Sequence, residues 1–359
     1  MLHLRLAGGQ SIDRLARHPP DCPAARSPKT LSQRPATRSV TLNHQREAPI
    51  ATALITHPAC LAHDPGDYHP ECPDRLRAVL RGLEQETFAD LLREAAPRAT
   101  VEQLSRAHPT DYVEAILAIV PDGDERVALD GDTVMSAGSA EAAVRAAGGA
   151  IAGVDAVMEG WARNVFVATR PPGHHAEPAR PCGFCLFNNV AVAAQHARTQ
   201  WGLKRIAVVD FDVHHGNGTQ AMFAADPNLF YGSSHQFPCY PGTGHPSERG
   251  VADNIVNVAL TPGSDSVAFR RGWEGTILPA LDAFAPELLL VSAGFDAHRA
   301  DPLADLRLDE RDFAWITTEL LAIAARHSSG RLVSVLEGGY DLDALAASAA
   351  VHVRALMQV

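Results

Sequence analysis

The sequence lacks two features that would each place it in another class of protein. It has no apolar run near the roughly 18 residues that a membrane-spanning helix needs, and its longest apolar stretches, such as 287–293, have the length of a strand. It has only six cysteines in 359 residues, and it shows no stretch with the pattern of a secretory signal. We therefore expect neither a membrane protein nor a secreted domain held by disulfides.

Basic residues are also scarce outside the first part of the chain. Residues 1–50 contain eight Lys/Arg and three Asp/Glu, a net charge of +5, whereas residues 51–359 contain 23 and 39, a net charge of −16. Nucleic-acid binding needs a basic surface, so we expect no direct nucleic-acid partner. The negative charge of residues 51–359 is typical of a cytoplasmic protein, because it favours solubility. It would also attract cationic substrates by electrostatic steering.

A Cys-x-x-Cys pair, Cys182 and Cys185, has no second pair of the same spacing beside it. A zinc ribbon needs two such pairs, so this kind of metal site is not expected. We interpret the pair as reduced thiols in a packed loop, and a redox-active pair stays open as the alternative.

The chain changes character near residue 50. Residues 1–50 are rich in Arg, Pro, Ser and Ala without a sustained period, which is typical of a disordered extension. A targeting segment or a translated upstream stretch would have a similar composition. Residues 51–359 contain no repeat of fixed period and no linker. We expect one folded domain over residues 51–359, and we predict that residues 1–50 are dispensable for its folding.

Short apolar runs alternate with helical patterns throughout that domain. Several runs are continuously apolar rather than alternating, as in strands buried on both faces of a sheet. This alternation predicts an α/β fold in which a central parallel sheet is flanked by helices on both faces. The expected strands are 51–56, 164–169, 205–211, 229–233, 254–260, 287–292 and 331–336, and the expected helices are 73–94, 139–159, 188–200, 266–284, 310–327 and 342–357.

Polar residues of catalytic types follow four of these strands. His174 and His175 follow one strand, the segment 210–215 ends the next, Asp296 follows a third and Tyr340 follows a fourth. Open α/β sheets form their sites at the carboxyl ends of the strands. We therefore expect these residues to share one site.

The segment 210–215 holds two carboxylates and two imidazoles within six positions. Alternate residues of an extended chain share a face, so we expect Asp210, Asp212 and His214 to point the same way. Buried carboxylates are costly unless they are paired or bound to a metal. Asp212 and His214 offer oxygen and nitrogen ligands that suit Zn²⁺, and Asp296 is the best candidate for a third ligand.

Groups for proton transfer and oxyanion binding are also present. Histidine titrates near neutral pH and suits proton transfer. The tandem His174 and His175 cannot both reach one atom equally, so we expect two different roles. Tyr340 follows two glycines, which permit close approach of the backbone, and its phenol is able to donate a hydrogen bond to a developing oxyanion.

These motifs together resemble the histone deacetylase superfamily, in the family's own order and from about residue 52 to the C terminus. Several of them resemble the class II branch, which includes bacterial deacetylase-like amidohydrolases. The matching segments are HPECPDRL at 69–76, RPPGHHA at 170–176, GFCLFNN at 183–189, DFDVHHGNGT at 210–219, SSHQ with YPGTG around 233–244, SAGFDA at 292–297 and EGGYDL at 337–342.

The resemblance implies the arginase–deacetylase fold and a zinc-dependent enzyme that removes acetyl groups from acetylated lysine or related amines. It implies one Zn²⁺ per chain, held by Asp212, His214 and Asp296. It also implies a structural monovalent cation, usually K⁺, near Asp210, Asp212, His214, Ser233 and Phe223.

The resemblance also assigns roles in catalysis. It implies that His175 is the general base and then the general acid, that His174 is an electrostatic partner paired with Asp210, and that Tyr340 polarises the acetyl carbonyl. The implied substrate channel is lined by Asp132, Gly183, Phe184, Tyr240 and Leu303.

One position departs from the class I branch of the family. Asn217 stands beside the second histidine, where class I members have an aspartate. An amide orients the imidazole without supplying a full charge, so we expect His175 to be less basic than in that branch.

The sequence disfavours three alternatives. An acetylpolyamine amidohydrolase would carry an acidic residue at the rim, where Leu303 stands. An arginase-type enzyme with two metals needs further bridging aspartates. A non-catalytic acyl-binding protein is disfavoured because the three ligand residues, both histidines and Tyr340 are all retained. The physiological substrate, the preferred acyl length and the oligomeric state stay open.

Overall fold

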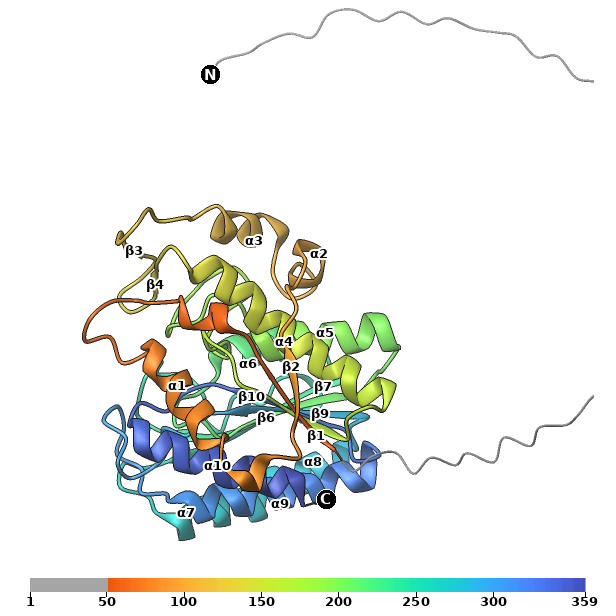
Figure 1. Ribbon diagram of the computed structural model, residues 1–359. Coiled ribbons are helices and arrows are strands. Elements are labelled where there is room, and N and C mark those ends of the chain that lie inside the picture. The colour runs from red at the N-terminus through yellow and green to blue at the C-terminus, as the bar shows by residue number, and fades with distance from the viewer. Residues whose placement is uncertain (1–50, 359) are drawn as a thin grey trace, which may run out of the picture. The chain divides into compact units, whose positions relative to one another are not determined.

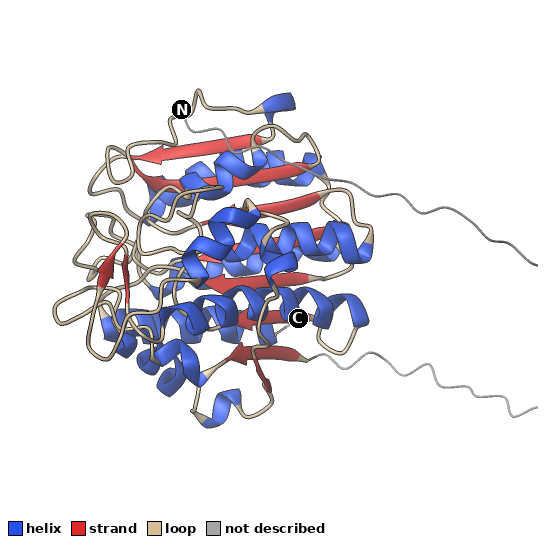
Figure 2. Cartoon of the chain, turned by 90° about the horizontal axis from the view of Figure 1, so that it is seen from above, coloured by secondary structure: helices blue, strands red, loops and turns tan. Residues whose placement is uncertain are grey.

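The computed structural model describes residues 51–358, and the expectation for residues 1–50 lies outside this range. Within the described residues, eight strands form one sheet that is parallel throughout, in the order β2-β1-β5-β10-β9-β6-β7-β8. Helices cover both faces of the sheet (Figure 1, Figure 2). The predicted α/β fold with a central parallel sheet is confirmed.

The strands lie close to the predicted runs, with two differences. β7 continues three residues beyond its predicted end, because β8 pairs with it as far as Gln236. The edge strand β2 was not predicted, because all its side chains are exposed and leave no apolar pattern. The strands are β1 Thr52–Thr56, β2 Leu92–Ala95, β5 Asn164–Val167, β6 Ile206–Asp210, β7 Leu229–Gln236, β8 Ile255–Leu260, β9 Leu288–Ala293 and β10 Leu332–Leu336, with a separate antiparallel pair, β3 Val127–Ala128 and β4 Val134–Met135.

The long helices agree closely with the prediction, and several short ones were not predicted. The α-helices are α1 Pro73–Gly82, α2 Val101–Leu104, α3 Thr110–Leu117, α4 Ser139–Glu159, α5 Asn189–Trp201, α6 Asn217–Phe223, α7 Ser266–Gly272, α8 Leu278–Phe284, α9 Glu310–His327 and α10 Leu342–Met357. Single 3₁₀ turns are η1 Pro58–Leu61, η2 Glu86–Phe88 and η3 Val251–Asp253, and η4 Trp273–Ile277 is a π-helical turn.

Two predicted helices were wrong in extent. The helix predicted over 73–94 ends at Gly82, where a Cβ would lie 3.1 Å from the carbonyl oxygen of Ala346, and the chain continues as η2 and β2. The helix predicted over 266–284 is divided by the π-helical turn η4. Pro279 lies in the first turn of the following helix, and proline has no N–H to continue the α-helical hydrogen bonds of that turn.

Apolar side chains are buried on both faces of the sheet, as β1 illustrates. Leu54 belongs to a cluster with residues of α1, α9 and α10, whereas Ala53 and Ile55 belong to a second cluster with residues of α4 and α5. Because both faces are covered, the carboxyl edge of the sheet is where polar groups can reach a ligand. No helix among the described residues combines the length and the apolar character that a membrane span requires.

Candidate active site

Four neighbouring strands at the centre of the sheet carry the predicted site residues at their carboxyl ends. The order of these strands is β5-β10-β9-β6. His174 and His175 follow β5, Tyr340 follows β10, Asp296 follows β9, and Asp210 ends β6. Residues separated by up to 166 positions therefore meet at one edge, because parallel strands align their carboxyl ends.

Asp212, His214 and Asp296 form a buried cluster that could hold a metal ion, since one ligand atom of each lies within 4.8 Å of the others. Nδ1 of His214 lies 3.2 Å from Oδ1 of Asp212 and 3.1 Å from Oδ2 of Asp296. Ligand bonds of about 2.0–2.2 Å to a tetrahedral zinc ion place ligand atoms at similar separations. The donor set and its spacing fit a divalent metal.

The charges of this cluster also favour the binding of a cation. Burial and the neighbouring charge of Asp212 raise the pKa of Asp296 to about 7. Burial would raise the pKa of Asp212 as well, but His174 and His214 hold it well below its usual range. Two buried carboxylates in contact with one imidazole are costly without a further positive charge.

Backbone amides hold these carboxylates in place. The N–H groups of His214 and Gly338 donate to Asp212, at 2.9 and 2.8 Å, and the N–H of Val213 donates to Asp296 at 2.8 Å. A Cβ at position 338 would lie 2.1 Å from Oδ2 of Asp296. Glycine is required there because the backbone passes directly against the two carboxylates.

The tandem histidines have different partners, as expected. Nδ1 of His174 donates to Oδ2 of Asp210 at 3.0 Å, and Tyr231 donates its hydroxyl to the same oxygen. Nδ1 of His175 donates to Oδ1 of Asn217 at 2.8 Å, and the amide of Asn217 donates in turn to Glu177. This arrangement leaves Nε2 of His175 without a proton, as a base requires.

The electrostatic surroundings set the two histidines apart. Burial would lower the pKa of His174, but the charges of Asp212 and Asp210 raise it to about 10. Burial and the charges of His174 and His214 hold the pKa of His175 well below its usual value. At neutral pH His174 is therefore cationic and His175 is neutral.

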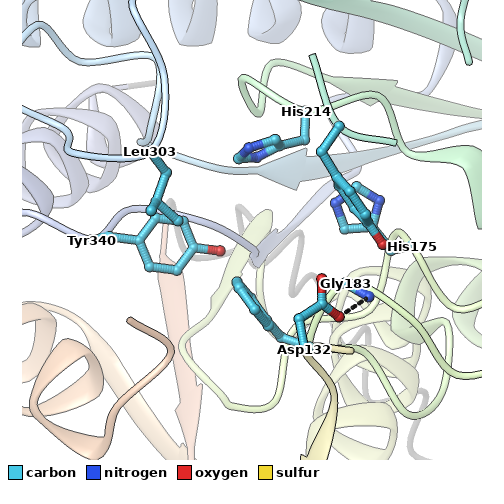
Figure 3. A pocket seen from close by; sticks show the side chains of 8 residues that line it. Asp132, His175, Gly183, His214, Leu303 and Tyr340 are labelled. Atoms are coloured by element: carbon cyan, nitrogen blue, oxygen red, sulfur yellow. Dashed lines mark hydrogen bonds between the residues drawn. The ribbon is translucent and has the colours of Figure 1, made fainter. Parts of the chain in front are cut away.

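A cavity of about 220 Å³ opens beside these groups, and Figure 3 shows the side chains around it. The phenol oxygen of Tyr340 points into this space from the side opposite His175 (Figure 3). All five residues predicted for the channel line the cavity together with His175, His214 and Tyr340; the five are Asp132, Gly183, Phe184, Tyr240 and Leu303.

Aromatic rings form the walls of this cavity. The ring of Phe184 meets that of Tyr340 edge to face at 5.9 Å, and Tyr240 meets His175 in the same way at 5.1 Å. Gly183 has a φ of 57°, and a Cβ there would lie 2.4 Å from the ring of His175. The absence of a side chain at this position keeps the histidine close to the cavity.

The residues predicted for the monovalent cation lie on neighbouring elements. Asp210 pairs with Ser233 across β6 and β7, and Asp212 and His214 follow β6. Phe223 is buried at the end of α6, and its carbonyl oxygen accepts a hydrogen bond from Asn254. Binding of K⁺ by this set stays a prediction.

Cys182 and Cys185 are free and buried beside the same site. The thiol of Cys182 donates to the carbonyl oxygen of His175 at 3.0 Å. Burial raises the pKa of both thiols, which disfavours the thiolate that redox chemistry needs.

Several buried charged residues around the site were not predicted to belong to it. Glu337 accepts the N–H groups of Gly173 and His174, and Asp301 accepts the N–H of Tyr340. The others are Glu71 and the two arginines that donate to it, Arg75 and Arg170. Four of these residues stand inside the motifs quoted above, so the motifs contained them, but no local pattern indicated what they contact.

Comparisons with known proteins agree with this geometry. The family description of a histone deacetylase domain matches residues 69–356. A histone deacetylase-like amidohydrolase of Pseudomonas aeruginosa is 41% identical over 279 residues, which cover 76% of this chain and 73% of that protein. The mouse polyamine deacetylase HDAC10 is 35% identical over 328 residues, which cover 86% of this chain and 48% of that protein.

A solved structure extends the agreement to three dimensions. The crystal structure of the HDA15 HD domain superposes with a TM-score of 0.80 at 33% sequence identity, covering 86% of this chain and 88% of that one. The arginase–deacetylase fold that the resemblance implied is thereby confirmed. The chain belongs to the histone deacetylase family and is a hydrolytic deacetylase.

Proposed function

We propose that this protein is a zinc-dependent deacetylase that hydrolyses acetyl-lysine or a related acylated amine to acetate and the free amine. One observation carries the proposal: His214 of the metal-ligand set, a neutral histidine with a free Nε2 and the phenol of Tyr340 all line one cavity. Amide hydrolysis needs an electrophilic site, a base and an oxyanion donor, and the cavity offers a residue for each.

Asp212, His214 and Asp296 would hold one Zn²⁺ per chain. When bound, this ion supplies a Lewis acid for the carbonyl and lowers the pKa of a water molecule to about 7 in favourable sites. Glu337 is not part of this ligand set. Its carboxylate accepts the N–H groups of Gly173 and His174 and so holds the loop of the histidines.

His175 would move the protons. Its Nε2 accepts a proton from the attacking water, and the resulting imidazolium then gives that proton to the leaving amine. Asn217 fixes the tautomer through Nδ1. His174, held cationic by Asp210 and Asp212, supplies positive charge beside the developing anion and keeps His175 from being protonated before the reaction.

Tyr340 would donate a hydrogen bond to the carbonyl oxygen as negative charge develops on it. Burial raises the pKa of its phenol well above the usual value, so the hydroxyl keeps its proton at neutral pH. The ring stands edge to face with Phe184, which aims the hydroxyl at the cavity.

The walls favour an unbranched alkyl stem. Phe184 and Tyr240 both line the cavity, and two rings facing a narrow space leave room for a chain of methylenes, as in acetyl-lysine. Leu303 at the mouth is 37% exposed and apolar, so this position offers no carboxylate to the cationic tail of a polyamine. This observation favours acetyl-lysine over acetylpolyamines.

A substrate panel with zinc-loaded protein tests the proposal. We expect acetyl-lysine peptides to be hydrolysed with a higher kcat/KM than acetylated polyamines. A preference for acetylpolyamines would assign the protein to polyamine turnover, and ligand binding without turnover of any acylated amine would make it an acyl-binding protein.

A further inference from the structure

Glu71 is a buried acid at the centre of a cluster of positive groups, although it contacts neither the cavity nor the metal ligands. Its side chain is 0% exposed. Both carboxylate oxygens accept from Arg170, through Nε and Nη2, and Oε1 also accepts from Arg75 at 3.0 Å. Nε2 of His63 lies 3.2 Å from Oε2.

Arg75 extends from this acid to the loop that presents Tyr340. Its Nε donates to the carbonyl oxygen of Gly339 at 2.6 Å and its Nη2 to that of Glu337. Its guanidinium carbon lies 4.7 Å from the centre of the Tyr340 ring, within the range of a cation–π contact. One side chain therefore holds the tyrosine loop on both sides of Gly338 and through the ring itself.

Arg170 extends from the same acid to the loop that presents the histidines. It is four residues before His174, directly at the start of that loop. Its Nη1 donates to the carbonyl oxygens of Cys60 and His63, and its Nη2 also donates to the carbonyl oxygen of Glu71. The beginning of the histidine loop is thus fixed to the segment that carries Glu71.

The two loops are also joined directly. Oε2 of Glu337, at the start of the tyrosine loop, accepts the N–H groups of Gly173 and His174 at 2.6 and 3.2 Å. A displacement of either loop is therefore transmitted to the other. Glu71 lies behind both loops and holds the two arginines that anchor them.

The charge of Glu71 cannot be replaced by its neighbours. Arg75 and Arg170 are both fully buried, and their other acceptors among the described contacts are neutral carbonyl oxygens. Burial would raise the pKa of Glu71, but Arg170 and His63 hold it far below the usual range. Without this carboxylate, two buried guanidinium groups would repel each other and turn away from their loops.

We propose that Glu71 is a positioning residue of the active site, which sets the placement of the Tyr340 hydroxyl and of the His174–His175 loop through its ion pairs with Arg75 and Arg170. The inference rests on the proposed deacetylase function. It adds a determinant of the reaction that lies outside the cavity, on the segment between η1 and α1.

The test compares Glu71→Gln and Glu71→Asp with the matched control Asp74→Asn in the zinc-loaded full chain. Asp74 is three positions away and also pairs with an arginine, Arg77, but this pair is 58% and 48% exposed on the surface of α1. The measurements are kcat and KM on an acetyl-lysine peptide, zinc content, and hydrogen exchange of peptides covering 170–176 and 337–341.

We expect Glu71→Gln to lower kcat on the order of 10- to 100-fold with KM within about 3-fold, because a small displacement of reacting groups has this effect. Zinc content should stay at one per chain, and both loops should exchange faster. The fall should shrink when Tyr340→Phe is already present, because part of what Glu71 positions is then missing. Asp74→Asn should change none of these values.

Glu71→Asp keeps the charge and should show the same pattern to a smaller extent, which covers the case in which Glu71→Gln does not fold. A normal kcat and normal exchange of both loops in the folded variant, even with a lower melting temperature, would overturn the proposal. If the double variant loses kcat by the full product of the two single losses, Glu71 does not act by positioning Tyr340. Wild-type protein without activity would instead refute the proposed function, and the exchange data would still decide the role of Glu71.

Discussion

The buried carboxylates behind the cavity and the rim of the cavity are built in different ways. The buried carboxylates, here called the floor, are Asp210, Asp212 and Asp296; they are 0% exposed and accept hydrogen bonds from backbone or side-chain donors. At the rim, Tyr240 and Leu303 are 42% and 37% exposed and stand on loops. The floor has one arrangement that its hydrogen bonds determine, whereas the rim can change without disturbing it. We therefore expect the chemistry to depend on the floor and the choice of substrate to depend on the rim.

Removal of one carboxylate from the floor and of one from the wall of the cavity should give the largest contrast. Asp212→Ala should lose the zinc ion and lower kcat on the order of 10³-fold or more, because the metal supplies several kcal/mol of transition-state stabilisation. Asp132→Ala, at the cavity wall, should keep one zinc per chain. Elemental analysis and steady-state kinetics measure both, and undiminished zinc in Asp212→Ala would remove this residue from the ligand set.

Two phenols line the same cavity and offer the next contrast. Tyr340→Phe should lower kcat about 10²–10³-fold at nearly unchanged KM, as expected for one oxyanion donor. Tyr240→Phe should change kcat by less than about 3-fold, since it keeps the ring that packs edge to face against His175. Equal effects of the two substitutions would contradict the assignment of the oxyanion donor.

Acid should lower the folding stability of the protein through the buried His352. Burial lowers the pKa of His352 to about 3, where its ring hydrogen-bonds with Thr317 and Ser334. An unfolded histidine has a pKa near 6.5, so below that pH the unfolded chain binds more protons and stability falls as the pH falls. When the pH falls from 7.5 to 5.0, the titration of this residue should lower the free energy of unfolding by about 2 kcal/mol.

Urea unfolding at these two pH values measures the loss. His352→Gln should be less stable at pH 7.5, but its own difference between the two pH values should be smaller by about that amount. The same pH dependence in both proteins would show that His352 does not carry the effect.

A charge placed at the rim should have the smallest effect. Leu303→Glu should raise kcat/KM for acetylated polyamines about 3- to 5-fold, because a partly solvated ion pair stabilises a complex only to that extent. Zinc content should stay unchanged. Leu303→Gln has nearly the same size without the charge and serves as the control. If the two variants favour polyamines equally, the position does not select by charge.

The difference between the floor and the supporting residues explains which parts of the site could be predicted. The metal-ligand and histidine positions follow buried strands directly, so apolar runs located them, and two Asp and two His within six residues indicated their chemistry. Glu71 and Arg170 are 99 positions apart, and Arg75 and Glu337 are 262 positions apart. No local period records such pairs, so their contacts emerged only from the folded structure.

The same reason applies to the fold. Several strands that are buried at every position, such as β9, were located within one or two residues. β2 has only exposed side chains and is held through the backbone of β1, so nothing in its composition distinguished it from the end of a helix. The short α6 begins at Asn217-Gly218, residues with low helix propensity, and its place is determined by the loops around the site.

The strand order also has a consequence for how the protein is made. β10 is the last strand in the sequence, yet it lies between β5 and β9 at the centre of the sheet. Until residues 332–336 have been synthesised, the strands β2-β1-β5 and β9-β6-β7-β8 have no partner that joins them. Each group then presents an open edge, a state prone to aggregation. Ribosomes must therefore complete residues 332–336 before an active site can exist, and a chain ended before β10 should be bound by chaperones rather than act as a weaker enzyme.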